Sequence, residues 1–123
     1  MASLTGTAFI GSWRIVWMAG WDTDYVDMEV PGHITFERNG VGCFQFGLVQ
    51  GQMDCRVKGQ RIEFTWSGFD EGDELSGRGH AEITDGELRG HFYIHLGDDS
   101  AFHAHRQEAR NPTKQKKGRP KPS

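Results

Sequence analysis

Short segments in which apolar and polar side chains alternate are the feature that most restricts the fold of this chain. In residues 61–67, Ile62, Phe64 and Trp66 alternate with polar residues, and residues 33–38 follow the same pattern. A period of two places the apolar side chains on one face of a β-strand. The chain also holds 17 glycines, and most of them fall between such segments, where they favour turns. The sequence therefore predicts many short strands, each with one buried face.

Eight such segments follow one another with short connections. The Asn39-Gly40 pair between two alternating runs is a strong hairpin signal, whereas residues 21–32 predict a loop or one helical turn and residues 69–75 an acidic loop. A long antiparallel meander usually closes, because closure removes unpaired strand edges. We therefore expect an all-β, eight-stranded antiparallel up-and-down β-barrel, with strands at residues 12–18, 33–38, 41–47, 53–58, 61–67, 76–84, 87–96 and 100–106.

Charge divides the chain into two parts. Residues 1–106 carry eight basic and sixteen acidic residues, a net charge of −8, whereas residues 107–123 carry six basic and one acidic residue, a net charge of +5. The second part has almost no apolar side chains, so it cannot bury enough surface to offset chain entropy. We expect a single barrel domain over residues 1–106 and a disordered basic tail over residues 107–123.

Composition also bears on where the protein acts. No apolar run approaches the roughly 18 residues of a membrane span, and the first residues lack the pattern of a signal peptide. The two cysteines, Cys43 and Cys55, are too few for a disulfide framework. We expect a cytoplasmic protein with reduced thiols, no membrane association and no cofactor.

The stretch FIGSWRIV at residues 9–16 carries a Gly-x-Trp motif at Gly11-Ser12-Trp13, followed by Trp21-Asp22. It resembles the first strand of the calycin barrels, the lipocalins and fatty-acid-binding proteins. The resemblance implies a calycin-like barrel in which Trp13 closes one end and Arg106, from the last strand, packs across it. The chain departs from the family in having room for only a short segment where fatty-acid-binding proteins place a two-helix lid, and in carrying Thr-Asp-Tyr early, at residues 23–25, rather than late.

The whole chain also resembles a bacterial family of uncharacterised hypothetical proteins, through VQGxxDCR-type and GDDS-type segments at residues 49–56 and 97–100. This second resemblance implies no activity, and it transfers no site residue.

Aromatic residues suggest a ligand site. An eight-stranded barrel is either just filled by its side chains or holds one small ligand, and both alternatives stay open. In either case Trp13, Phe36, Phe64 and Trp66 form the interior wall, and Arg106 or a histidine would fix a polar group. The function we expect is non-enzymatic binding of a small apolar or amphipathic ligand.

The segment HFYIHLGDDSAFHAH, residues 91–105, contains four histidines. A turn at residues 97–99 pairs His105 with His91 and gathers the histidines on one strand face, opposite Phe92, Ile94, Leu96, Phe102 and Ala104. Three interpretations follow: a solvated outer face, a polar interior site, or a metal site formed by His91, His95, His103 and His105, since opposed histidines can chelate.

Acidic loops offer an alternative function. Carboxylates gather at residues 22–29 and 70–74, and paired carboxylates or a hard cation can support hydrolysis. A small metal-dependent or carboxylate-based hydrolase, which would also use the histidine segment, is therefore the alternative enzymatic hypothesis.

The basic tail suggests a different partner. Its segment KKGRPK resembles an AT-hook, through Gly118, Arg119 and Pro120, with Lys117 where the hook has arginine. The resemblance implies weak nucleic-acid contact, mostly through phosphates. A DNA-associated adaptor is thus a third hypothesis.

Overall fold

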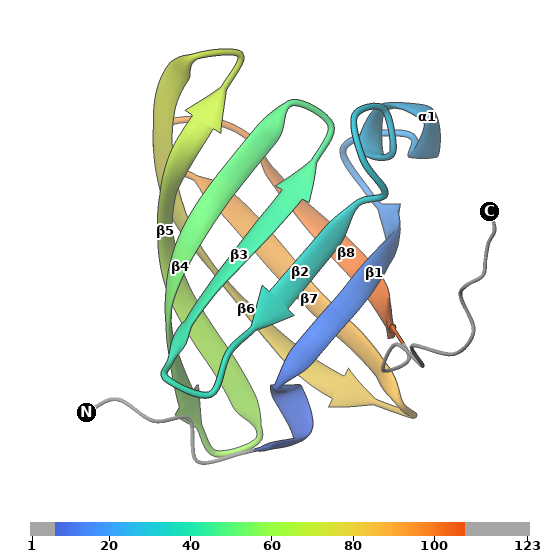
Figure 1. The fold of residues 1–123 in the computed structure, drawn as a ribbon, viewed down its shortest axis with the longest axis vertical. Coiled ribbons are helices and arrows are strands. Elements are labelled where there is room, and N and C mark those ends of the chain that lie inside the picture. Colours follow the sequence, from blue (N-terminus) through green and yellow to red (C-terminus); the bar gives the residue numbers. More distant parts are fainter. Residues whose placement is uncertain (1–6, 108–123) are drawn as a thin grey trace, which may run out of the picture.

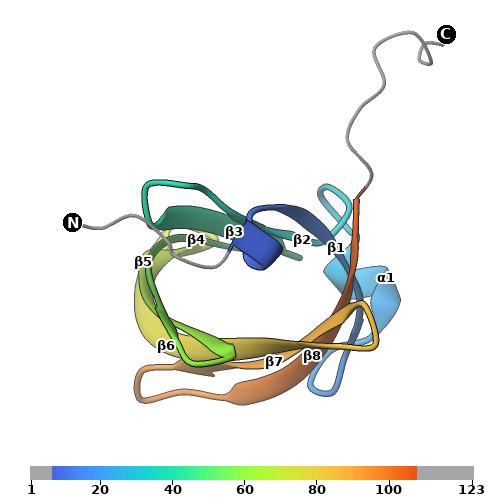
Figure 2. The ribbon, with the colours of Figure 1, turned by 90° about the horizontal axis from the view of Figure 1, so that it is seen from below.

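The computed structural model describes residues 7–107. Eight antiparallel strands form a closed barrel in which each strand pairs with the next along the chain and β8 pairs with β1. Figure 1 shows the barrel from the side, and Figure 2 shows the ring of strands from one end. The predicted eight-stranded antiparallel barrel is confirmed. The strands are β1 (Gly11–Met18), β2 (His33–Phe36), β3 (Val41–Phe46), β4 (Val49–Lys58), β5 (Arg61–Asp70), β6 (Asp73–Thr84), β7 (Glu87–Ile94) and β8 (Asp99–Arg106).

Two short helical segments lie at opposite ends of the barrel (Figure 1). The 3₁₀ turn η1 (Thr7–Phe9) precedes β1, and the buried ring of Phe9 lies 6.1 Å from that of Phe36. The single-turn helix α1 (Thr23–Val26) follows β1, and the Asp22 side chain caps it by accepting a hydrogen bond from the Tyr25 N–H. The helical turn expected within residues 21–32 is therefore confirmed.

The acidic segment 69–75 is not a loop, and this expectation was wrong. Asp70 ends β5 and Asp73 starts β6, with only Glu71 and Gly72 between them. Both connecting residues have positive φ, 53° and 89°, as a two-residue hairpin turn that matches the strand twist requires. The strands β4, β5 and β6 are consequently longer than the sequence pattern predicts, and the β5–β6 hairpin extends their outer surface.

Aromatic rings fill the barrel interior. A continuous series of ring contacts, with centroids 4.7–6.3 Å apart, runs through the barrel from Phe9 to Phe36, Phe64, Phe92, Phe44 and Trp66. Glycines on the inner face make room for these rings: a Cβ atom at Gly51 would stand 2.5 Å from the Phe44 ring, and one at Gly79 would stand 2.5 Å from the Phe64 ring. The interior is therefore a packed core in which large rings lie over strand positions without side chains.

One serine is buried with this core. Ser100 is 2% exposed, and its hydroxyl accepts a hydrogen bond from the Gly20 N–H and donates one to the Ala101 carbonyl. This serine, which ends the GDDS segment, thus joins the start of β8 to the chain that follows β1.

Among the described residues, no helix has the length and apolar character needed to cross a membrane.

Candidate functional site

The four predicted wall residues all point into the barrel. Trp13, Phe36, Phe64 and Trp66 are between 1% and 4% exposed. Phe36 and Phe64 contact each other, with ring centroids 6.3 Å apart, and Trp66 meets Phe44 edge to face at 5.0 Å. The apolar surfaces of these side chains are thus buried against neighbouring rings.

Arg106 packs across Trp13, as the calycin resemblance implies. Its guanidinium carbon lies 4.1 Å from the centre of the Trp13 ring, a distance typical of a cation–π contact. The same guanidinium donates hydrogen bonds to the carbonyls of Ile10 and Ala8, and the Trp13 indole N–H donates to the Phe9 carbonyl at 3.0 Å. Arg106 therefore fastens the segment before β1 to the end of β8.

The histidine hairpin has a different register from the predicted one. His105 lies opposite Glu87 and His91 lies opposite Ala101, so the expected His91–His105 pair does not form. The connection is a four-residue loop, residues 95–98, which the Ile94 N–H closes by donating to the Asp98 carbonyl, and Leu96 within it adopts a φ of 60°. Leu96, expected on the apolar face, is 94% exposed.

The pairing differs by four residues, and an even shift keeps every strand residue on its face. Phe92, Phe102 and Ala104 are buried as expected, and the alternation places His91, His103 and His105 on the outer face. Each of these three has its own partner: His91 contacts Asp99, His105 lies 2.8 Å from a Glu87 carboxylate oxygen, and His103 packs on Trp17. Within residues 7–107, no three histidine, cysteine, aspartate or glutamate side chains come together in a way that could hold a metal ion.

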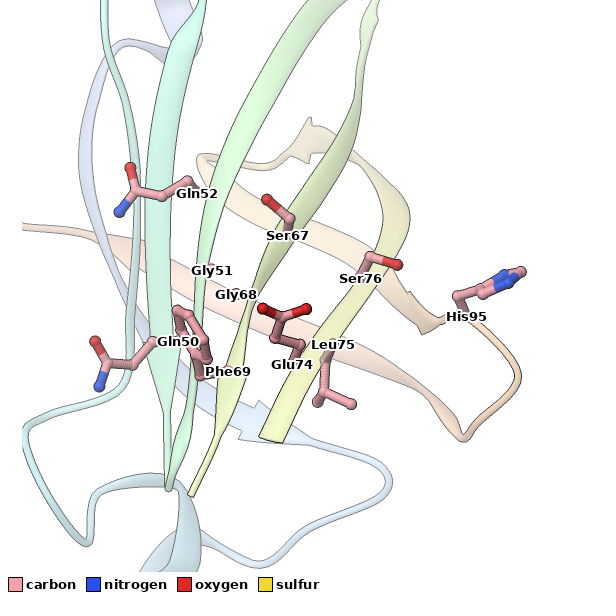
Figure 3. Close-up of a pocket in the computed structure, with 10 residues that line it drawn as sticks. All are labelled: Gln50, Gly51, Gln52, Ser67, Gly68, Phe69, Glu74, Leu75, Ser76 and His95. Carbon is pink, nitrogen blue, oxygen red and sulfur yellow. The ribbon is translucent and has the colours of Figure 1, made fainter. Parts of the chain in front are cut away.

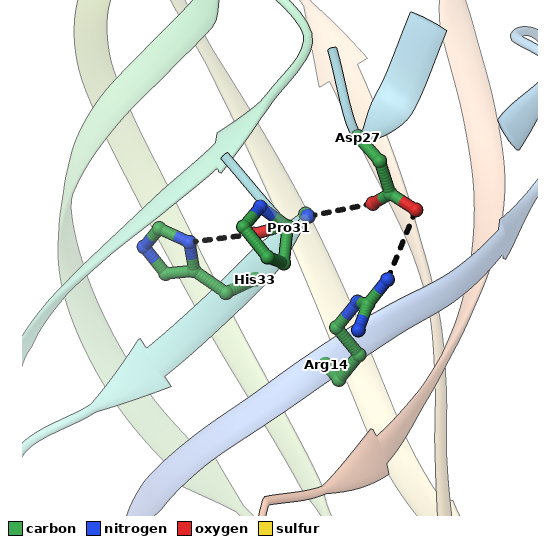
Figure 4. A network of polar contacts seen from close by, with 5 residues as sticks. Arg14, Asp27, Pro31 and His33 are labelled. Atoms are coloured by element: carbon green, nitrogen blue, oxygen red, sulfur yellow. Dashed lines mark hydrogen bonds and ion pairs between the residues drawn. The ribbon is translucent and has the colours of Figure 1, made fainter. Parts of the chain in front are cut away.

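The first acidic segment has structural roles. One Asp27 carboxylate oxygen accepts a hydrogen bond from the Arg14 guanidinium at 3.0 Å, and the other accepts one from the Gly32 N–H at 2.8 Å. Figure 4 shows these contacts beside the ring of His33, whose Nδ1 lies 3.3 Å from the Pro31 carbonyl oxygen. Asp27 thus ties the connection between α1 and β2 to β1, and Asp22 caps α1.

A groove on the outer face of β4, β5 and β6 is the main feature that sequence reasoning missed. It has a volume of about 670 Å³, within the 300–1,000 Å³ typical of small-molecule sites. Figure 3 shows side chains from three strands around it, with His95 at one side. Its lining residues are Gln50, Gly51, Gln52, Ser67, Gly68, Phe69, Glu74, Leu75, Ser76 and His95.

The floor of this groove is made of backbone. Gly51 and Gly68 are register partners on β4 and β5, and a Cβ atom at Gly68 would stand only 1.7 Å from the Gln50 carbonyl oxygen. Such close approach of two backbones is possible only at glycine. Around this floor stand the amides of Gln50 and Gln52 and the ring of Phe69, which is 51% exposed.

A second hollow adjoins the groove and shares Ser76 and His95 with it. It has a volume of about 430 Å³, and its other lining residues are Thr65, Trp66, Gly77, Arg78 and Tyr93. The Arg78 guanidinium lies over the Tyr93 ring, 4.4 Å from its centre. The two hollows together present hydroxyl, amide, imidazole and guanidinium groups beside an exposed aromatic ring.

The sequence contained a signal for this site. Phe69 falls on the polar side of the alternation in β5, and two glycines interrupt runs that otherwise read as strands. Assigning residues 69–75 to a loop concealed the first signal, and the predicted strands at residues 53–58 and 61–67 left both glycines outside them. Of the other predicted site residues, Lys117, Gly118, Arg119 and Pro120 lie outside the described residues.

The chain matches no protein-family model, and searches of curated proteins and of solved structures also find no match.

Proposed function

We propose that this protein is a non-enzymatic binding module for a small amphipathic ligand, and that the ligand occupies the outer groove. The observation that carries the proposal is a hollow of about 670 Å³ with a half-exposed phenylalanine beside amide and hydroxyl groups. Binding sites of this size combine apolar surface with a few placed polar groups. An exposed aromatic ring next to hydrogen-bonding groups suits a ligand with both kinds of surface.

Binding inside the barrel is the other location for such a ligand, with Trp13, Phe36, Phe64 and Trp66 as walls and Arg106 as a polar anchor. The calycin-like resemblance favours it. The interior is the less favoured location, because these aromatic side chains already contact neighbouring rings and the Arg106 guanidinium already contacts three groups.

The two cysteines are free, which suits a reducing compartment, and we place the protein in the cytoplasm.

The experiment is thermal unfolding of the untagged protein with a panel of fatty acids, fatty alcohols and small aromatic compounds. A ligand that binds only the folded state raises stability as its concentration exceeds Kd. Phe69→Ala removes the exposed ring from the groove, and we expect it to weaken binding about tenfold, since an aromatic contact contributes roughly 0.5–1.5 kcal/mol. Val41→Ala, at a residue that is 44% exposed and does not line the groove, is the matched control.

Equal affinity of the wild type and Phe69→Ala for a stabilising ligand contradicts the groove. If Phe64→Leu weakens the same ligand while Phe69→Ala does not, the ligand lies in the barrel interior. A panel in which no compound stabilises the protein contradicts the proposed function itself.

A further inference from the structure

Arg78 is a cation held in place by an aromatic ring, and it has no acidic partner in the part of the chain that the structure describes. Its guanidinium makes no ion pair with any carboxylate in residues 7–107, and stacking on Tyr93 restrains it at 4.4 Å from the ring centre. A guanidinium in this position keeps its N–H donors free, in a planar arrangement that matches carboxylate, phosphate or sulfate. The strand register places it between Thr65 on β5 and Tyr93 on β7.

The groups beside Arg78 in this hollow can donate hydrogen bonds. Thr65 and Ser76 contribute hydroxyl groups, and each hydroxyl can donate one hydrogen bond. Trp66 points into the barrel and its indole N–H is buried, so it takes no part in this outer site. The hollow therefore offers two hydroxyl donors next to the Arg78 guanidinium.

The absence of acids from this lining contrasts with the rest of the barrel, where acidic residues outnumber basic ones two to one. The carboxylates nearest in register are Glu63, diagonal to Arg78 across the β5–β6 pair, Asp54, opposite Thr65, and Asp99, opposite Tyr93. All three already have partners, since Glu63 pairs with Arg61, Asp54 pairs with Arg56, and Asp99 contacts His91.

We propose that this second hollow is an anion subsite, in which Arg78, Thr65 and Ser76 hold the carboxylate, phosphate or sulfate end of the ligand. This inference rests on the proposed function, and it names the chemical class of the ligand: an amphiphile whose body lies in the groove and whose anionic end lies at Arg78. Ser76 and His95 line both hollows, so one molecule can span them. Glu74 stands four residues before Arg78 on β6, about 13 Å along the strand, where its charge is largely screened.

The test is an NMR titration of the full-length protein with sodium phosphate, sulfate and acetate at constant ionic strength. The Ser76 backbone N–H and the Arg78 Nε–H are the reporters. We expect both resonances to shift and saturate with at least one anion, and the comparison of phosphate and sulfate with acetate identifies the preferred class. Arg78→Gln should abolish the saturable shift, whereas Arg38→Gln, which removes an equal charge from the exposed β2–β3 turn, should keep it.

Failure to observe a saturable shift with any of the three anions overturns the anion subsite, as does an unchanged titration in Arg78→Gln.

A comparison of octanoate with octanol then distinguishes failure of the anion subsite from failure of the proposed groove. We expect octanoate to bind at least tenfold more tightly than octanol, because hydrogen bonds to a charged group are the stronger kind, and we expect this preference to vanish in Arg78→Gln.

If octanol binds with dependence on Phe69 and octanoate has no advantage, the groove stands and the anion subsite fails. If phosphate or sulfate binds at Arg78 and neither octanol nor octanoate binds at Phe69, the anion subsite stands and the amphipathic ligand fails.

Discussion

Cys43 and Cys55 lie on neighbouring strands but on opposite faces of the barrel wall. Cys55 is buried in the core, whereas Cys43 lies on the outer face of β3, between Thr35 and Gln52. Burial and the nearby Asp54 carboxylate raise the pKa of the Cys55 thiol to about 12. Burial and the Glu37 carboxylate also raise the pKa of Cys43. Period-two alternation predicts these opposite faces, but sequence alone could not show which thiol is buried.

Thiol reactivity should follow this difference. Because the thiolate is the reactive form, we expect Cys55 to resist a disulfide reagent at neutral pH until the protein unfolds, and Cys43 to react slowly in the folded state. The measurement is the rate of labelling of the wild type and of Cys43→Ser, with and without denaturant. Labelling of folded Cys43→Ser at the wild-type rate would contradict the assignment.

His80 gives the folded protein a dependence on pH. Burial lowers its pKa, and the positive charges of Arg61 and His91 lower it further, while Glu63 and Glu82 oppose them. The unfolded chain therefore binds the proton more readily than the folded protein does. By linkage, this contribution to stability is complete above the unfolded pKa, near 6.5, and is lost as the pH falls toward the lowered pKa of the folded state.

We expect His80→Gln to reduce the loss of stability between pH 7.5 and pH 5.5. The measurement is the free energy of unfolding by urea at both values for the wild type, for His80→Gln and for a control variant, His33→Gln. An identical pH dependence in His80→Gln and the wild type would show that His80 does not contribute.

At the scale of strands, inward glycines determine how the barrel packs. A Cβ atom at Gly79 would stand 2.5 Å from the Phe64 ring and 2.6 Å from the His91 carbonyl oxygen. The second of these atoms belongs to backbone and cannot rotate away. We expect Gly79→Ala to destabilise the protein by about 1–3 kcal/mol, as overpacked cores do.

Urea denaturation measures this cost, with Gly20→Ala as the control. The nearest atom to a Cβ at Gly20 is the Ser100 Cβ, 3.3 Å away, against 2.5 Å for the nearest atom at Gly79, so we expect a smaller loss of stability in Gly20→Ala than in Gly79→Ala. Equal stability of Gly79→Ala and the wild type would mean that the β5–β6–β7 wall is less tightly packed than the structure indicates.

Strand order and strand faces could be predicted from alternation, but hairpin register could not. Because one face of the hairpin is buried, an odd shift in the pairing register of β7 against β8 is excluded, since it would expose Phe102 and Ala104. Even shifts keep the same faces, so the choice among them depends on contacts far apart in sequence. Here the Gly20 N–H donates to the Ser100 hydroxyl, 80 residues away in sequence, and this contact holds the start of β8 in its observed position.

At the scale of the molecule, the barrel separates a packed interior from a hollowed outer face. The sequence predicts which aromatic residues point inward, yet it leaves open whether they surround a cavity. Ring-to-ring distances decide that question, and they depend on how strands distant in sequence meet. The outer groove was harder to predict, because it forms where Gly51 and Gly68 meet across two strands and Phe69 stands beside them.

The most direct test of groove binding is to locate a bound amphiphile by intermolecular NOEs between octanoate methylene protons and the aromatic and side-chain amide protons of the labelled protein. We predict NOEs to the ring of Phe69 and to the side-chain amides of Gln50 and Gln52, which line the groove. NOEs to Phe36 and Phe64, without any to Phe69, would place the ligand inside the barrel and contradict the account.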